Sequence, residues 1–156
     1  MIVPDVNLLL YAYDASNPFH SQAAKWWSEC LSGDEPVGLP SVVLFGYLRI
    51  STNRKIFQNP LTVAEAGQHI ESWLSQPVAR LLEPGQNHVA RTLVLLKDLG
   101  SAGNLVTDAQ IASLAIANQA IVHTADADFS RFRDVLWFNP LTGERNKPVS
   151  KKRRPR

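Results

Sequence analysis

The sequence contains one cysteine, Cys30, so a disulfide within the chain and a cysteine-based zinc site are both excluded. We expect Cys30 to be a small buried residue of an amphipathic helix. No apolar run approaches the ~20 residues that a membrane-spanning helix needs, and no signal-peptide pattern opens the chain. We therefore expect a soluble, cytoplasmic protein that does not bind a membrane.

Positive charge is scarce outside the last residues of the chain. The formal net charge is +2, but five of the 16 basic residues lie after residue 150, which leaves 11 against 14 acidic residues in the rest. The basic residues Lys151, Lys152, Arg153 and Arg154 suit contact with an RNA backbone through counterion release. A flexible, solvated terminus without a ligand is the alternative.

The length of 156 residues and the 45% hydrophobic content predict one compact domain. Strands are expected at 2–3, 37–39, 78–82, 121–123 and 135–138. Helices are expected at 8–12, 23–31, 42–50 (with Ser41 as N-cap), 62–75 (with Thr62 and Glu65 as a capping box), 87–99, 104–118 and 127–132. This alternation predicts an α/β fold in which helices flank a central, mainly parallel sheet.

Three local features carry separate expectations. Pro4 lacks the N–H that a central strand needs, so either the strand's ladder begins later or its pairing is irregular there. Trp26 and Trp27 are adjacent on a helix and are expected not to face one core together, which would place one of them at an interface. His123 is assigned either to packing within a strand or to the vicinity of the acids described next.

Two of the expected strands end in an aspartate. Asp5 follows the first strand and Asp126 follows the strand at 121–123. Because ligand sites in parallel sheets lie beyond the carboxyl ends of the strands, both carboxylates are expected to face one crevice. Taken alone, Asp5 is better explained as a turn residue at a strand end, and Asp126 as the N-cap of the short helix that follows.

A third aspartate, Asp108, comes from a helix. The apolar residues of that helix span an arc centred near Asp108, while Gln110 and Ser113 are expected to point away from the core. A carboxylate on the buried face is costly unless it is paired, hydrogen-bonded or bound to a cation. The alternative is a first-turn acid that complements the helix dipole.

Together the acids form a cluster that would repel itself at neutral pH without a divalent cation. Carboxylate oxygens favour Mg²⁺ or Mn²⁺ over zinc. Such ions activate water and neutralise the charge of a scissile phosphate, so the sequence predicts phosphodiester hydrolysis.

Short motifs in a fixed order carry a family resemblance. They are Asp5-Val6-Asn7, the segment 104–109 that opens a helix, the segment 124–129 after a late strand, and the flanking segments 40–52 and 137–141. Over residues 2–141 their order and spacing resemble PIN-domain proteins, especially VapC-type toxins of bacterial toxin–antitoxin pairs. The resemblance implies a PIN-like three-layer domain at 1–141. The polar composition after that point, rich in Lys, Arg and Pro, predicts a basic, flexible tail at 142–156.

The resemblance also implies an activity. It is that of a Mg²⁺- or Mn²⁺-dependent endoribonuclease that cleaves tRNA, rRNA or mRNA, is inhibited by a VapB-type antitoxin and forms a homodimer. The acids expected at the site are Asp5 and Asp108 as principal metal ligands, Asp126 completing the cluster and Asp128 at its rim. Asn7 and Thr124 would orient carboxylates or water.

One position departs from the family pattern. Many members carry Glu-x-x-Arg in the helix after the second strand, where this chain reads Gly46-Tyr47-Leu48-Arg49. Gly46 cannot bind a metal, so a catalytically silent PIN domain that binds RNA or protein is the alternative function. Arg49 keeps its place and would neutralise a carboxylate or bind a phosphate, or else be an exposed helix arginine. Phosphatase chemistry of the haloacid-dehalogenase kind needs Asp-x-Asp after the first strand, and Asn7 breaks that pattern.

Overall fold

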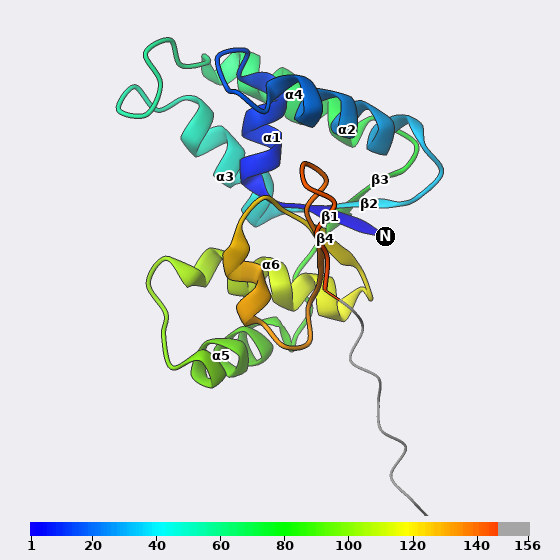
Figure 1. Ribbon diagram of the computed structural model, residues 1–156, viewed down its shortest axis with the longest axis vertical. Coiled ribbons are helices and arrows are strands. Elements are labelled where there is room, and N and C mark those ends of the chain that lie inside the picture. Colours follow the sequence, from blue (N-terminus) through cyan, green and yellow to red (C-terminus); the bar gives the residue numbers. More distant parts are fainter. Residues whose placement is uncertain (147–156) are drawn as a thin grey trace, which may run out of the picture.

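The computed structural model describes residues 1–146 and shows one five-stranded sheet between two layers of helices (Figure 1). The strands are β1 (Ile2–Pro4), β2 (Val37–Pro40), β3 (Ala79–Leu82), β4 (Ile121–His123) and β5 (Leu136–Phe138). Their order is β3-β2-β1-β4-β5, and every neighbouring pair is parallel. The predicted α/β fold is confirmed.

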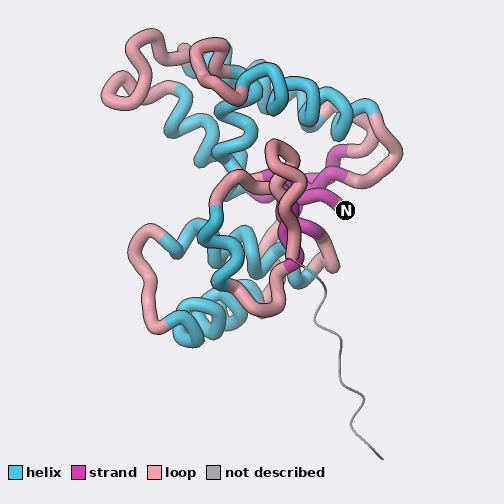
Figure 2. The backbone as a smooth tube through the Cα atoms, viewed as in Figure 1, coloured by secondary structure: helices cyan, strands magenta, loops and turns pink. Residues whose placement is uncertain are grey.

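The helices divide into two groups on opposite sides of the sheet (Figure 1, Figure 2). One group consists of α1 (Val6–Tyr13), α2 (His20–Ser32), α3 (Ser41–Ser51) and α4 (Val63–Leu74). The other consists of α5 (His88–Leu99), α6 (Leu105–Ala117) and the 3-10 helix η1 (Ala127–Arg131). Among the residues described, no helix is long and apolar enough to cross a membrane.

By the general rule for open parallel sheets, the strand order predicts a ligand site beyond the ends of β1 and β4. The chain builds outward from β1 through β2 to β3 on one side, and then adds β4 and β5 on the other side. At such a reversal the loops after the two central strands diverge, which opens a crevice beyond their carboxyl ends. β1 and β4 are in register from Ile2↔Ile121 to Pro4↔His123, so the residues that follow them, Asp5 and Thr124, lie side by side.

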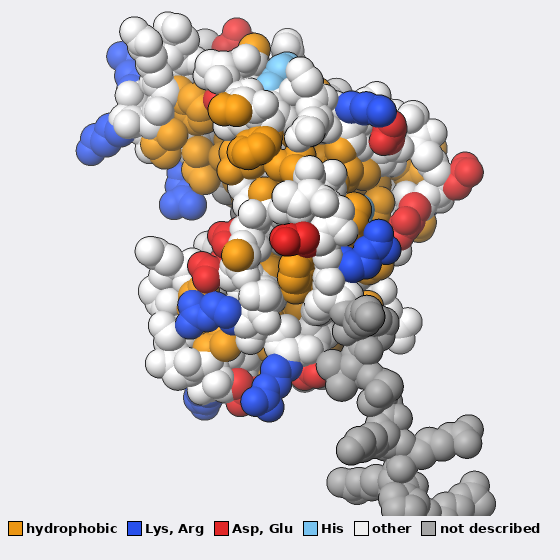
Figure 3. Space-filling model, in the orientation of Figure 1, with side chains coloured by type: hydrophobic (Ala, Val, Ile, Leu, Met, Phe, Trp, Pro, Cys, Tyr) orange, Lys and Arg blue, Asp and Glu red, His pale blue; other side chains and the backbone are white. Residues whose placement is uncertain are grey.

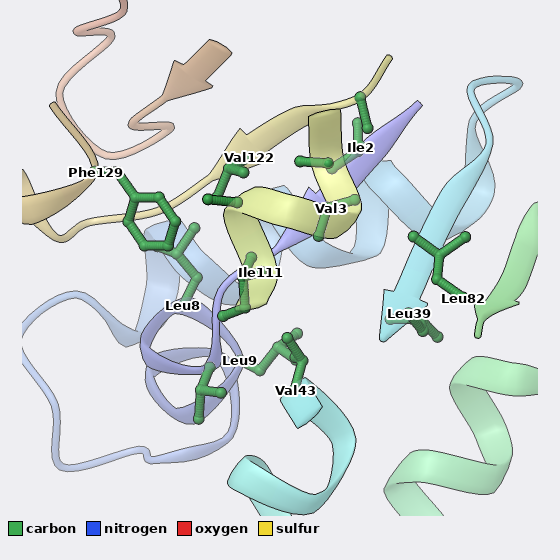
Figure 4. Packing of buried hydrophobic residues seen from close by; sticks show 14 of the residues in the cluster. Ile2, Val3, Leu8, Leu9, Leu39, Val43, Leu82, Ile111, Val122 and Phe129 are labelled. Atoms are coloured by element: carbon green, nitrogen blue, oxygen red, sulfur yellow. The ribbon is translucent and has the colours of Figure 1, made fainter. Parts of the chain in front are cut away.

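The core is built from strand residues that are buried on both faces of the sheet, as parallel strands between two helix layers require. Val3 and Val122 are fully buried in the central strands, and Leu8 of α1 and Ile111 of α6 pack toward them from the helices (Figure 4). Phe129 of η1 closes the core beyond β4. This packing fixes the ends of β1 and β4, and with them the acids.

Pro4 is accommodated by irregular pairing on one side of β1. Ile2 donates its N–H to Pro36 of the β2 segment, and the two-residue period of a strand turns the nitrogen of Pro4 to the same side. There β1 pairs with β2 only at Ile2↔Val37, whereas its ladder with β4 has three residue pairs. Of the two possibilities, the irregular pairing is the one observed.

The expectation that Trp26 and Trp27 cannot share the core is wrong. Both are buried, because other elements cover α2 on each of the two sides to which these adjacent residues point. The Trp27 ring meets Trp73 of α4 edge-on with ring centroids 5.6 Å apart. Trp26 Nε1 donates a 3.0 Å hydrogen bond to Nδ1 of His123, which gives His123 a packing role.

Two smaller expectations about helices are also wrong. Ser113 is fully buried instead of facing away from the core, because α5 covers that side of α6. Its hydroxyl donates to the carbonyl of His88 over 3.4 Å. The N-cap of α3 is Pro40 and not Ser41, one residue earlier than expected. The capping box of Thr62 and Glu65 and the buried state of Cys30 are confirmed.

Candidate metal centre

Asp5 is the first residue after β1 and the N-cap of α1. Its Oδ1 accepts a 2.7 Å hydrogen bond from the N–H of Val6, and its Oδ2 accepts a 2.8 Å hydrogen bond from the hydroxyl of Thr124. The side chain is buried, with 6% of the residue exposed. Asp5 is therefore both the residue that ends the strand and the N-cap of the helix. Its two hydrogen bonds fix the position of its carboxylate.

Thr124 joins the loop after β4 to Asp5. Besides its bond to Asp5, its hydroxyl oxygen accepts a 2.9 Å hydrogen bond from the N–H of Asp126. Asp126 in turn caps η1, because its Oδ1 accepts a 2.8 Å bond from the N–H of Asp128. Asn7 steadies the same loop by accepting a 3.4 Å hydrogen bond from the N–H of Ala125.

Three carboxylates converge in front of this loop. Asp108, Asp126 and Asp128 each offer an oxygen, and these oxygens lie within 4.8 Å of one another. Asp108 comes from the first turn of α6, and the other two flank the start of η1. Asp128 is the most open member, with 49% of its side chain exposed. Its Oδ1 lies 3.6 Å from Nη1 of Arg131.

The electrostatics of the cluster favour a bound cation or proton. Burial, together with the charges of Asp5, Asp126 and Asp128, raises the pKa of Asp108 to about 7. Burial also raises the pKa of Asp5 to about 6, against hydrogen bonds from Thr124, the Val6 N–H and Asn7, while the charge of Asp126 adds to the rise. Asp5 therefore belongs to the same electrostatic unit as the three converging acids.

The ligand set fits a hard divalent cation. It consists of carboxylate oxygens, and among the described residues no histidine or cysteine joins the group. Mg²⁺ and Mn²⁺ prefer such oxygen ligands, and a cation would relieve the repulsion that raises the pKa of Asp108. Asp108, Asp126 and Asp128 have the spacing to hold one directly.

The structure gives a physical reason for Gly46. A Cβ atom built on Gly46 would lie 2.9 Å from Cγ2 of Val6, closer than real side chains approach. Gly46 is thus the point at which α3 approaches the first turn of α1, next to Asp5. In this backbone, a glutamate at position 46 would collide with Val6.

The remaining residues predicted for the site do not join the cluster. Arg49 is exposed in the last turn of α3, and within residues 1–146 no hydrogen bond or ion pair links it to an acid. The basic segment 151–154 lies outside the described residues. Arg131 was not predicted, although its spacing three residues after Asp128 on a helix was a usable signal.

A pocket of about 450 Å³ that sequence reasoning missed opens beside Asp126. Its walls combine the loop after β4 with the end of β5 and the segment that follows. The lining residues are Thr124, Ala125, Asp126, Ala127, Ser130, Trp137, Asn139, Glu144 and Arg145.

Comparison with known proteins agrees with this architecture. Residues 2–135 match the model of the PIN domain. The chain belongs to the PIN-domain family. It is 43% identical over 141 residues to Ribonuclease VapC33 of Mycobacterium tuberculosis, which covers 90% of this chain and 99% of that protein. The predicted resemblance to VapC-type PIN-domain proteins is confirmed.

Solved structures of more distant proteins share the fold of this PIN domain. The crystal structure of VapC20 from Mycobacterium tuberculosis, described as a sarcin-ricin loop cleaving toxin, superposes with a TM-score of 0.64 at 18% identity and covers 83% of this chain and 93% of that chain. VapBC2 from Rickettsia felis, bound to a promoter DNA fragment, gives a TM-score of 0.63 at 20% identity, with coverages of 88% and 97%.

Proposed function

We propose that this PIN domain is a metal-dependent endoribonuclease and the toxin of a toxin–antitoxin pair. The observation that carries the proposal is the convergence of Asp108, Asp126 and Asp128 to within 4.8 Å at the crevice between β1 and β4. The 43% identity to a ribonuclease that aligns over 99% of its own length supports RNA as the substrate class. RNA of the tRNA, rRNA or mRNA kind is the expected substrate.

Mg²⁺ or Mn²⁺ bound here would supply an activated water and neutralise charge on the scissile phosphate. Asp108 and Asp126 would be ligands, and Asp128 would bind from the open side, where a substrate phosphate can enter. Asp5 would act as a ligand held rigid by its two hydrogen bonds, while Thr124 and Asn7 fix its position relative to the loop after β4.

Positive groups near the crevice would then bind the RNA backbone. Arg131 lies at the rim through its contact with Asp128. Two further contacts with the RNA are assigned to Arg49 on α3 and to the basic segment Lys151, Lys152, Arg153 and Arg154. Both would contribute affinity that weakens with salt and carries no sequence preference.

A protein partner is part of the same proposal. Figure 3 shows hydrophobic side chains gathered over the layer of α1 to α4, above acidic side chains near the middle of the face. In this layer Phe45 is 67% exposed and Ile56 is 56% exposed. Apolar surface of this kind marks protein interaction sites, and we propose a VapB-type antitoxin and a second copy of the chain as its partners.

The test is cleavage of defined RNAs by antitoxin-free protein. We expect fragments to appear with Mn²⁺ or Mg²⁺, to disappear with chelator, and to be absent for Asp108→Asn at the same protein concentration. The control variant is Asp98→Asn, which removes an acid from the end of α5, outside the cluster. Intact RNA under all conditions, from protein that is folded and binds Mn²⁺, would overturn the proposal.

Gly46 favours a second candidate, a catalytically silent PIN domain that binds RNA or protein. Without the family's glutamate the cluster has one acid fewer to hold a cation. This candidate predicts RNA binding that is unaffected by chelator and by Asp108→Asn, together with no cleavage. A gel-shift titration run beside the cleavage assay separates the two functions.

A further inference from the structure

The pocket beside Asp126 is built by a chain reversal after β5. The N–H of Asn139 donates to the carbonyl of Glu144 over 2.8 Å, and the N–H of Gly143 donates to the carbonyl of Asn139 over 2.8 Å. Gly143 has a φ of 80°, a conformation that glycine adopts without strain. This tight loop returns Arg145 to a bridge with Phe138, so that residues 139–145 form one wall of the pocket.

The wall is held firmly to the sheet. Asn146 accepts a 2.9 Å hydrogen bond from the N–H of Trp137 and donates to the carbonyl of Val135, and so pairs one N–H on the free edge of β5 and the carbonyl just before that strand. The Arg145 guanidinium lies 5.0 Å from the centre of the Phe138 ring. The pocket is therefore a pre-formed feature, as ligand sites commonly are.

We propose that this pocket binds the nucleobase next to the scissile phosphate, and that it favours a base with an exocyclic amino group over uracil. The inference rests on the proposed ribonuclease function, because it uses the metal centre as its reference point. Asp126 belongs to both the acidic cluster and the pocket wall, so a nucleotide in the pocket is adjacent to a phosphate at the cluster.

The chemistry of the lining fits a base better than a phosphate. Trp137 offers an indole, which can stack on the flat face of a base. Arg145 lines the same pocket, while its guanidinium lies over the Phe138 ring. Glu144 and Asp126 are acceptors whose charge opposes a phosphate in the pocket itself. The volume of about 450 Å³ lies within the usual range for small-ligand sites, about 300–1,000 Å³.

The preference for an amino group follows from Glu144 and Asn139. An ionised carboxylate only accepts hydrogen bonds, and an exocyclic amino group donates them. Cytosine presents such a donor where uracil presents a carbonyl oxygen, which a carboxylate repels. Asn139 uses its Oδ1 to accept from the N–H of Leu141, which leaves its amide NH₂ to donate to the base or its ribose.

The first test measures binding without cleavage. Full-length ¹⁵N-labelled protein in chelator is titrated with cytidine and, separately, uridine, and the indole N–H signals are followed, with Trp137→Phe to assign one of them. We expect cytidine to shift the Trp137 signal at about fivefold to tenfold lower concentration than uridine, with the Trp73 signal unmoved. Glu144→Gln should reduce the difference between the two nucleosides.

The second test measures cleavage. RNA oligonucleotides that differ only in the bases flanking the cut are digested with Mn²⁺ by the wild type, Glu144→Gln, Arg145→Ala and the control Arg80→Ala, which changes an exposed arginine on β3. We expect Arg145→Ala to raise KM about tenfold with little change in kcat, Glu144→Gln to flatten the base preference, and Arg80→Ala to match the wild type.

The outcomes separate the two proposals. No cleavage of any RNA, together with cytidine binding at Trp137, overturns the ribonuclease and leaves the base pocket supported. Cleavage with no response of Trp137 to either nucleoside, and with the same base preference in Glu144→Gln, overturns the base pocket alone. Equal binding of cytidine and uridine overturns the amino-group preference.

Discussion

The Thr124 hydroxyl donates a 2.8 Å hydrogen bond to Oδ2 of Asp5, and this contact joins the ends of the two central strands. The same oxygen accepts from the N–H of Asp126 over 2.9 Å. One buried hydroxyl thus sets the distance between the acid that follows β1 and the loop that carries Asp126 and Asp128. The spacing of the cluster depends on a residue that is itself no metal ligand.

Replacement of Thr124 should therefore weaken metal binding. Thr124→Val keeps the volume but removes both hydrogen bonds, so the pKa of Asp5 should rise further and the loop after β4 should loosen. We expect Mn²⁺ affinity, measured by calorimetry, to fall about tenfold, and cleavage to fall with it. Thr124→Ser retains the hydroxyl and should recover most of the loss; equal defects in both variants would contradict this role.

Substitutions of Asp5 should separate its structural and chemical roles. Asparagine caps helices as well as aspartate does, so Asp5→Asn should keep α1 in place while removing the charge from the cluster. Asp5→Ala should also lose the cap, at a cost of about 1 kcal/mol in the free energy of unfolding. We expect both variants to lose cleavage, and denaturant titration to show that only the alanine variant loses stability at neutral pH.

The raised pKa values predict how stability depends on pH and metal. Asp5 and Asp108 hold protons in the folded state up to pH values of about 6 and 7, whereas in the unfolded chain they release them near 3.8. Their contribution to stability therefore declines as pH rises from about 4 to 7. A divalent cation replaces those protons, so saturating Mn²⁺ should raise Tm by roughly 5–10 °C at neutral pH and by less at pH near 5.

Asp108→Asn provides the control for that measurement. Without the charge at position 108, the metal-free protein should melt higher than the wild type at neutral pH and respond weakly to Mn²⁺. His123 acts in the opposite direction, because burial lowers its pKa to about 4 and its contribution is lost as pH falls from 6.5. Because both proteins contain His123, comparing the wild type with Asp108→Asn at each pH cancels its contribution to stability. A wild-type response to Mn²⁺ in the variant would contradict the assignment of Asp108.

Gly46 and Gly67 offer a matched pair of helix glycines. A methyl group on Gly46 would meet Val6 at 2.9 Å, while one on Gly67 of α4 would meet nothing within 4 Å. Gly46→Ala should thus destabilise the protein by about 1–2 kcal/mol, and Gly67→Ala should stabilise it by about 0.5–1 kcal/mol. In denaturant titrations, the double variant Val6→Ala with Gly46→Ala should lose less free energy of unfolding than the two single variants lose in sum. Strict additivity of the two losses would exclude the clash.

The order of strands and helices could be predicted because each signal was local. Apolar strands before Asp5 and Asp126 identify the sheet, and the geometry of parallel sheets then requires both acids to share an edge. The capping box at Thr62 and the left-handed Gly100 likewise mark helix ends with residues a few positions apart. Predictions of this kind depend on no contact between distant segments.

The burial of Trp26, Trp27 and Ser113 and the pocket beside Asp126 were missed because they depend on such contacts. Trp26 and Trp27 both find cover because α4 and β4 approach α2 from different directions, which no pattern within α2 reveals. Ser113 is buried only because α5 folds over α6. The pocket beside Asp126 requires the turn at Gly143 that brings Arg145 back to Phe138.

The pairing of β1 with β4 also bears on when activity could first arise during synthesis. Asp5 leaves the ribosome well before its partner Thr124, which follows 119 positions later. Until β4 has docked beside β1, no nascent chain holds the acids together, however well α1 to α4 have formed. An enzyme that attacks RNA would thus remain inert during synthesis until the segment that carries β4 has emerged and paired with β1.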